Sequence, residues 1–536
     1  MEKLRDFIDQ GGTNKNNEEI NSIINQIMEE SANLANGIAE TGELLEAGEF
    51  LYSVASLIEE IDHSKSLNIL EIVERYWEKQ ISSFKLQARL HEIAEIYTRL
   101  ADLHADKFKD HKLERKNIRN SINFLKQETK LLKDFNEIRK LAQNYQNIAE
   151  LYIKILDYKR ATKFYAFVIE VSKSFRYFDL LAYSYQQIAS CFQELDDYDR
   201  SNNQILDGIE YFLDLFEEYE EKNDNLTVAQ LSQVLRKLYQ LIDDNTQFVN
   251  YSKKEAGAYI NLAEFLEKIP ENFQKIATFY RGAALCYQEI DNNLIESASC
   301  FVLAGNFSEK IEDYDESAVN FFNAAVTFKE MNNLDMTYKH FIKAADNYWK
   351  NGNVNDSTES YLNAYDIAVE GDLEYNQFGL FNQIVRGLSI IAKEGLKNKQ
   401  FYTAATLILE SIKFYQKLDT AKDFLLKEMV RNVYKYYYKA ANLKEIGKSH
   451  IVQSYVLAAI SSILNGRIDK AREIISKLNS TGTTERKYKE LVETMITWIN
   501  QGKSIEFEKF SYPLQRIIEN SEEIMYLLRL FKGYKI

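Results

Sequence analysis

Apolar residues recur every three or four positions through most of this chain, which is the spacing of one face of an α-helix. The segment 90–103, LHEIAEIYTRLADL, shows the pattern, and 401–418 and 424–441 keep it. Only two prolines, Pro270 and Pro513, and 19 glycines are present among 536 residues. β-Meanders and sandwiches need frequent turn residues, so the pattern predicts an all-α protein.

The helical pattern also repeats along the chain. LAQNYQNIAELYIKILDYKRATKFYAFVIE begins at Leu141, and LAYSYQQIASCFQELDDYDRSNNQILDGIE begins forty positions later (Leu181 minus Leu141). Identical residues recur in register at 141/181, 142/182, 145/185, 146/186, 148/188, 149/189, 157/197, 158/198 and 160/200. The segment 296–368 repeats with the same offset, since Ala344 follows Ala304 by forty positions.

A repeat of this length holds two helices, and neither can bury its apolar stripe alone. Stacking of successive pairs is therefore required, and we predict a right-handed superhelix of antiparallel helix pairs that ends in a C-terminal helical bundle. Asp157 and Asp197 lie between the two helices of their repeats. We expect both to cap the second helix by accepting backbone N–H bonds. Gly466 is expected to end a helix near the C-terminus.

The repeat register is interrupted near residues 220–256, where the acidic run EEYEEKNDN precedes a polar stretch. We therefore predict a boundary there, with a second array that begins at about Lys254. The resulting domain prediction has four parts: a flexible N-terminus (1–17), an N-terminal repeat array (18–250), a second array (251–445) and a C-terminal bundle (446–536).

The second half of the chain resembles the soluble NSF attachment protein (SNAP) family over residues 255–536. The resemblance rests on ESASCFVLAGNFSEK, on SYVLAAISSILNGRIDKAREIISKL, and on the closing KYKELVETMITWINQGKSIEFEKF and IMYLLRLFKG. The arrays also look like tetratricopeptide (TPR) repeats whose helices are longer than in the usual 34-residue unit.

The SNAP resemblance implies a non-enzymatic adaptor in vesicle and membrane trafficking. Such an adaptor binds a SNARE-type helical bundle on its concave face and recruits an AAA+ ATPase for disassembly through its C-terminal bundle. By position, the basic residues expected to contact the SNARE bundle are Lys310, Lys329, Lys339 and Lys343. The residues expected to face the ATPase are Leu527, Leu528, Arg529 and Lys532, in a run that also contains Leu530.

Three features differ from the family pattern. The sequence ends in FKGYKI where the family carries an acidic tail with a leucine, residues 1–250 have no counterpart, and Thr246 to Tyr251 lacks the adjacent phenylalanines of a membrane-touching loop. The alternative hypothesis is therefore a generic TPR-like scaffold that binds another protein or a peptide in its concave groove.

The charge balance of the chain indicates which classes of partner to expect. The chain has 66 Lys and Arg against 81 Asp and Glu, a net charge of −15, so we expect no nucleic-acid partner. The most basic window, 107–120, is interpreted as a solvated helix face, with contact to an acidic protein or an anionic membrane surface as the alternative. No apolar run is long enough to span a bilayer, so we expect a cytoplasmic protein, with peripheral membrane contact left open.

No residue pattern indicates catalysis, a cofactor or a metal. Cys191, Cys286 and Cys300 are far apart among core positions and are expected to be buried thiols. His104 and His111, seven apart, are expected to share a helix face but have no zinc-ligand partners at the usual spacing. The sequence thus predicts a protein that is not an enzyme.

Overall fold

The computed structural model describes residues 17–59, 61–269, 271–290, 293–418, 423–443, 448–478, 483–503 and 505–533. These residues form helices and turns and contain no strand, which confirms the all-α prediction. The chain divides into two compact units, Met1–Tyr251 (unit 1) and Ser252–Ile536 (unit 2). Residues 1–16 of the predicted flexible N-terminus lie outside the described part.

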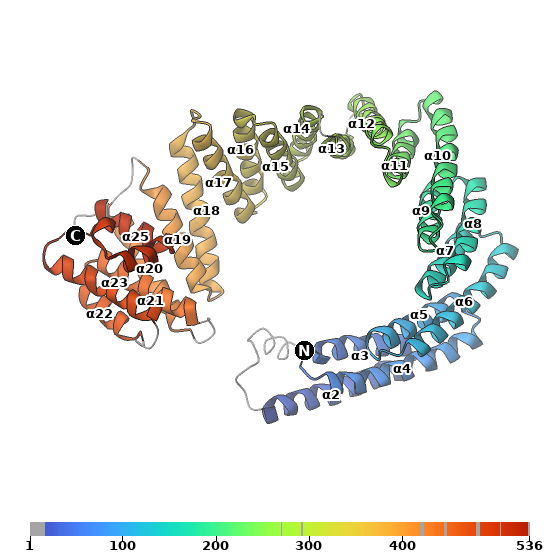
Figure 1. Cartoon of the computed structure of the whole chain (residues 1–536), viewed down its shortest axis with the longest axis horizontal. Coiled ribbons are helices and arrows are strands. Elements are labelled where there is room, and N and C mark those ends of the chain that lie inside the picture. The colour runs from blue at the N-terminus through green and yellow to red at the C-terminus, as the bar shows by residue number, and fades with distance from the viewer. Residues whose placement is uncertain are drawn as a thin grey trace. The chain divides into compact units, whose positions relative to one another are not determined.

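The helices of unit 1 are α2 (Asn17–Glu40), α3 (Leu44–Glu59), α4 (His63–Leu86), α5 (Leu90–Asp106), α6 (His111–Asp134), α7 (Ile138–Lys154), α8 (Tyr158–Phe175), α9 (Phe178–Gln193), α10 (Tyr198–Glu221) and α11 (Asn225–Leu241). Each packs against the next, and α9 also contacts both α7 and α11. Unit 1 therefore has two rows, with odd-numbered helices on its inner side and even-numbered helices on its outer side (Figure 1).

The helices of unit 2 are α13 (Phe273–Gln288), α14 (Leu294–Lys310), α15 (Tyr314–Glu330), α16 (Leu334–Lys350), α17 (Val354–Glu370), α18 (Gln377–Lys397), α19 (Phe401–Tyr415), α20 (Asp423–Ala441), α21 (Lys448–Leu464), α22 (Ile468–Ser476), α23 (Thr483–Asn500), α24 (Tyr512–Glu519) and α25 (Glu522–Gly533). Sequential antiparallel packing runs from α13 to α21. This arrangement is the TPR-like α-solenoid that the repeats predicted.

Several turns between paired helices share one design. The residue before the cap is left-handed, as in Leu156 (φ 62°) and Asp196 (φ 56°). The next residue caps the second helix: Asp157 Oδ1 accepts from Arg160 N at 3.2 Å, and Asp197 Oδ1 accepts from Arg200 N at 3.2 Å. The predicted capping role of both aspartates is thus confirmed. Because one left-handed residue reverses the chain, the paired helices can be close neighbours.

Small residues let the helices approach closely, and serines join them. The hydroxyl of Ser317 on α15 donates to the Gly305 carbonyl on α14 at 2.9 Å, and Ser357 on α17 donates to the Ala345 carbonyl on α16 at 2.8 Å. A side chain at Gly305 would meet the Phe321 ring 3.0 Å away. The Ala, Ser and aromatic positions that define the sequence repeat are therefore the packing contacts between helices.

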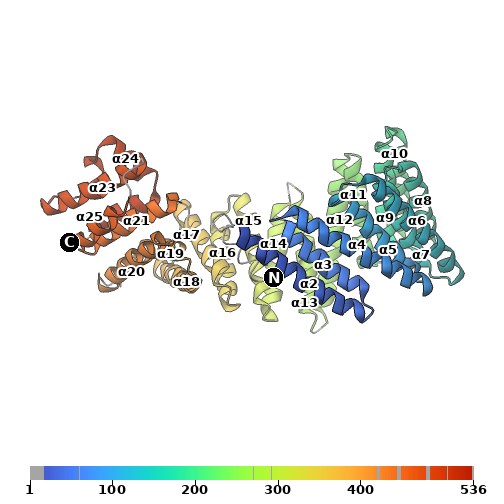
Figure 2. The ribbon, with the colours of Figure 1, turned by 90° about the horizontal axis from the view of Figure 1, so that it is seen from below.

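The last helices of unit 2 gather into a cluster instead of extending the row (Figure 2). Helix α21 contacts α20, α22, α23 and α25, and α24 contacts α23 and α25. Their shared core includes Val456, Ile460, Leu491 and Leu527, all fully buried. The predicted C-terminal bundle is present, and its core also draws side chains from α19 and α20. Gly466 follows α21 with φ 69°, as expected of a glycine at a helix end.

One sequence-based expectation was wrong, namely that His104 and His111 share a helix face. Helix α12 (Asn245–Glu267) begins within the polar stretch, ahead of the predicted start of the second array at about Lys254. The carboxylate of Asp244 accepts from Gln247 N at 3.0 Å and starts the helix within a polar stretch that resembles a loop. His104 and His111 lie on different helices, α5 and α6, because the chain turns between Lys107 and Asp110.

In the described part of the chain, every helix is too short or too polar to cross a membrane.

Candidate protein-binding surfaces

A polar groove lies on the inner side of unit 1, between α5 and α7. Its volume is about 340 Å³, and α6 forms its floor through Ser121 and Leu125. The polar lining residues from the two inner helices are His91, Glu95, Thr98, Arg99, Asn147, Glu150 and Lys154. The groove thus presents hydrogen-bond donors, acceptors and charges of both signs from two repeats.

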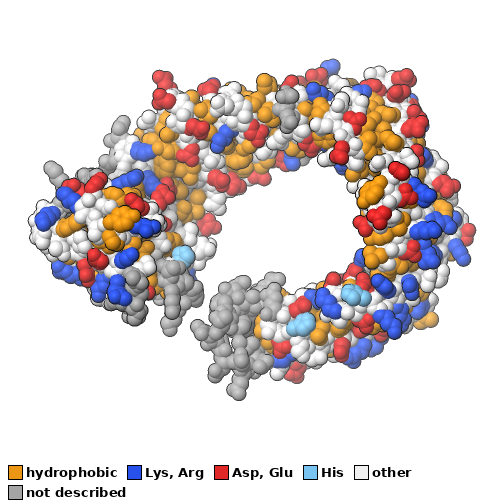
Figure 3. Space-filling model, in the orientation of Figure 1, with side chains coloured by type: hydrophobic (Ala, Val, Ile, Leu, Met, Phe, Trp, Pro, Cys, Tyr) orange, Lys and Arg blue, Asp and Glu red, His pale blue; other side chains and the backbone are white. Residues whose placement is uncertain are grey.

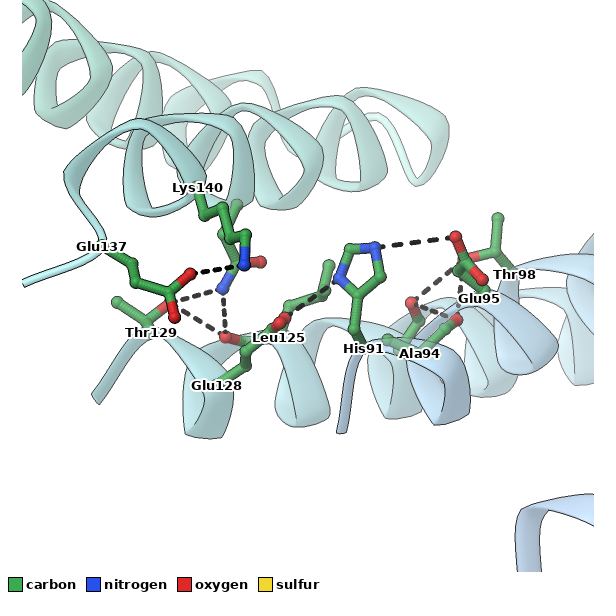
Figure 4. A network of polar contacts seen from close by, with 11 residues as sticks. His91, Ala94, Glu95, Thr98, Leu125, Glu128, Thr129, Glu137 and Lys140 are labelled. Atoms are coloured by element: carbon green, nitrogen blue, oxygen red, sulfur yellow. Dashed lines mark hydrogen bonds and ion pairs between the residues drawn. The ribbon is translucent and has the colours of Figure 1, made fainter. Parts of the chain in front are cut away.

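His91 connects two helices, α5 and α6, at one end of this groove (Figure 4). Its Nδ1 lies 3.1 Å from Glu128 Oε2 on α6, and its Nε2 lies 3.6 Å from Glu95 Oε1 on α5. The hydrogen bond to Glu128 raises the pKa of His91 above its usual 6.5, although partial burial opposes the rise. Protonated His91 is therefore a bridge between α5 and α6.

We expect the contribution of His91 to stability to depend on pH. Its folded-state pKa is raised, so the contribution is complete below the unfolded pKa of about 6.5 and is lost as pH rises through the folded value. Because the ring is half exposed, the effect should be about 0.2–1 kcal/mol. Urea unfolding of wild type and His91→Gln should differ more at low than at high pH. A His91 pKa at or below 6.5, measured by NMR, would contradict the expectation.

The other charges of the groove pair across helices. Arg99 pairs with Glu49 on α3, and Lys154 Nζ lies 2.8 Å from Asp102 Oδ1 on α5. Tyr183 on α9 donates to Glu150 Oε1 at 3.1 Å. The hydroxyls of Thr98 and Ser121 lie 3.0 Å apart. These contacts fix the walls of the groove, so a partner would meet a preorganised surface.

The four lysines predicted to bind a SNARE bundle are spread over α14, α15 and α16. Lys310 ends α14 and Lys329 lies in the last turn of α15, so these two lie at opposite ends of an antiparallel helix pair. Lys310 Nζ lies 4.1 Å from the Phe307 ring centroid, and Lys343 Nζ lies 4.5 Å from that of Phe321. Lys339 pairs with Asp335 at 2.6 Å. Lys329 is exposed and has no ion pair among the described residues.

The residues predicted to face an ATPase lie on α25, where some side chains are buried and others are exposed. Leu527 and Leu528 are 0% and 5% exposed and belong, with Leu530, to the core of the C-terminal bundle. Because they anchor α25, a direct contact with a partner would require the bundle to open. Arg529 is exposed and borders a groove of about 720 Å³ next to Lys413 and Lys417. The side chain of Lys532 lies outside the described ones.

The three cysteines are buried and unbridged, as predicted. Burial raises the pKa of Cys191 and Cys300 to about 11, so their thiols stay protonated at neutral pH. Within the described ranges, no group of three or more His, Cys, Asp and Glu side chains is placed to hold a metal.

The inner groove is not evident from the sequence alone. Its signal is a pair of polar stripes at helical spacing, His91, Glu95 and Thr98 on α5 and Asn147, Glu150 and Lys154 on α7. A polar stripe on one helix is typical of any solvated face. Only the packing of α5 beside α7 on α6 turns two such stripes into the walls of one groove.

No family model and no curated protein matches this chain. Among solved structures, BtubC (BKLC) from P. vanneervenii is 14% identical, covers 53% of this chain and 93% of its own, and has a TM-score of 0.21. The apo form of RapI is 11% identical, covers 74% of this chain and 99% of its own, and has a TM-score of 0.18. A human IFIT1 dimer with m7Gppp-AAAA is 13% identical, covers 82% of this chain and 87% of its own, and has a TM-score of 0.20. Likeness at these TM-scores carries no information about partners.

Proposed function

We propose that the protein is a helical-repeat scaffold that binds a protein partner on the inner side of unit 1. The α5–α7 groove carries the proposal, because side chains of two repeats converge there on a preorganised polar recess. Asn147 and Thr98 can hydrogen-bond the backbone of a bound segment, while Glu150 and Lys154 can select its charges.

A bulky residue in the groove tests this function. Asn147 is a half-buried lining residue of α7, so Asn147→Trp should fill the recess and weaken partner binding about tenfold or more. Affinity capture with quantitative mass spectrometry compares this variant with wild type. Gln127→Trp, at an exposed position on α6 outside the groove, is the matched control. Equal capture of all partners by the three proteins would contradict the proposal.

A SNAP-like adaptor is the second candidate. It is favoured by the order of unit 2, in which a helical array leads into a terminal bundle, and by the resemblance of residues 255–536. In this role the array would hold a SNARE-type bundle, with exposed cations such as Lys329, and the terminal bundle would recruit an AAA+ ATPase through surface groups such as Arg529. The test is a pull-down on immobilised protein with a purified SNARE-type bundle and a purified AAA+ ATPase. Retention of neither would contradict the adaptor role and leave the scaffold function as the remaining proposal.

A further inference from the structure

A second groove, with a different charge, lies on the outer side of unit 1 between α6 and α8. Its volume is about 660 Å³. Its charged lining residues are Arg115, Arg119 and Lys126 on α6, Arg160 and Lys163 on α8, and Asp157 at the start of α8. Lys and Arg side chains gather on this side of the unit (Figure 3). A chain with a net charge of −15 therefore concentrates five cations in one recess.

Most of this positive charge has no counter-charge among the residues that the structure describes. Asp157 is engaged, because its Oδ1 accepts from Arg160 N and its Oδ2 lies 3.2 Å from Arg160 Nη1. Arg115, Arg119 and Lys163 are exposed and make no ion pair within the described part of the chain. The first two are four residues apart on α6 and face the same groove. Their guanidinium groups suit bidentate binding of carboxylates or phosphates.

Aromatic rings form the floor but do not offer a stacking platform. Tyr152 is 5% exposed, and Lys126 donates to its hydroxyl at 2.7 Å. The same ammonium lies 5.3 Å from the ring centroid of Phe164. Single-stranded nucleic acids bind through free ring faces on which bases stack. Because Lys126 covers the rings of the floor, the groove is better suited to the side chains of a peptide than to stacked bases.

The next groove limits the length of an anionic ligand. Between α8 and α10 the lining includes Asp207, Glu210 and Asp214. A long polyanion that crossed the outer side beyond α8 would meet these carboxylates and be repelled. A membrane surface also fits poorly, because the cations line a recess between helices that flat headgroup layers do not enter.

We propose that the α6–α8 groove binds an acidic peptide segment of a partner protein. Aspartate or glutamate carboxylates of the segment pair with Arg115, Arg119 and Lys163, and an apolar side chain packs against Phe164 and Phe167. The site is separate from the inner α5–α7 groove, so it stands whether or not the proposed scaffold function there is correct.

Fluorescence anisotropy with a labelled glutamate- and leucine-rich peptide tests the site on the full-length protein. The double variant Arg119→Glu/Lys163→Glu should weaken binding about tenfold or more, and added salt should weaken the wild-type complex. The control, Lys116→Glu/Lys159→Glu, makes the same charge change at exposed positions of α6 and α8 outside the groove lining. It should change binding by no more than about twofold.

Three outcomes overturn the proposal: no peptide binding by wild type, equal weakening in both double variants, or tighter groove-dependent binding of oligo-dT or phosphatidylserine vesicles than of the peptide. Circular dichroism checks that each variant is folded. If the reversal variant unfolds, Arg119→Gln/Lys163→Gln replaces it, with the same expected direction and Lys116→Gln/Lys159→Gln as its control.

Discussion

Replacing Phe321 with alanine is expected to lower the free energy of opening of helices α14–α16 by about 3–5 kcal/mol. The Phe321 ring is 0% exposed and lies against Gly305 on α14 and beside His340 and Lys343 on α16. Its removal leaves a cavity at the junction of three helices. Because a repeat is stabilised mainly by its neighbours, the loss should remain largely local to this part of unit 2.

Hydrogen exchange with mass spectrometry measures this local effect directly. Amides of α14, α15 and α16 should exchange faster in Phe321→Ala, while those of unit 1 should keep their protection. Phe378→Ala is the control, since that ring on α18 is 52% exposed and should contribute less than about 0.5 kcal/mol. Uniform loss of protection over the whole chain would show that the repeats unfold as one cooperative body.

Replacing Gly387 with alanine should destabilise unit 2, although the same change in a solvated helix is stabilising. A Cβ at this buried position of α18 would lie 2.0 Å from Oγ1 and 3.0 Å from Cβ of Thr358 on α17. Overpacking costs about 1–3 kcal/mol. The gain in helix propensity from glycine to alanine is about 1 kcal/mol, so the net change should be a loss.

Gly257→Ala on α12 is a matched control with the opposite expected sign, because a Cβ there meets nothing within 4 Å. Thr358→Ala in the Gly387→Ala background should recover part of the loss, since it removes the colliding hydroxyl and methyl group. Thermal unfolding of the four proteins provides the comparison. A Gly387→Ala protein as stable as wild type would contradict the expectation, because it would mean that α17 and α18 move apart to accept the Cβ with no loss of unfolding free energy.

The basic α6–α8 groove of unit 1 would let a chain with net negative charge bind the proposed acidic ligand. Bulk charge sets the long-range field, but screening limits it to about 10 Å at moderate salt. Within that distance, Arg119 and Lys163 outweigh the single carboxylate of Asp157. The alternation of a basic α6–α8 groove with an acidic α8–α10 groove would then favour a short ligand over a long polyanion.

Local regularities of the sequence determined the helices and their pairing. The apolar spacing within each helix, the Asp157 and Asp197 caps and the glycine at 466 each depend on residues within a few turns of one another. The forty-residue offset from Leu141 to Leu181 shows that the same local pattern recurs. Such local features can be read from one chain, because helix periodicity and capping act between near neighbours. The start of α12 was missed because its polar residues resemble a loop until Asp244 is seen to cap them.

Only the tertiary structure decided which side chains meet. Arg119 and Lys163 lie on different helices and share a groove because of how α6 and α8 pack around α7. Leu527 and Leu528 resembled a partner-binding run but became core, since the bundle covers them on several sides. Convergence and burial depend on helix crossing and on contacts between distant residues, which a periodic sequence pattern does not contain.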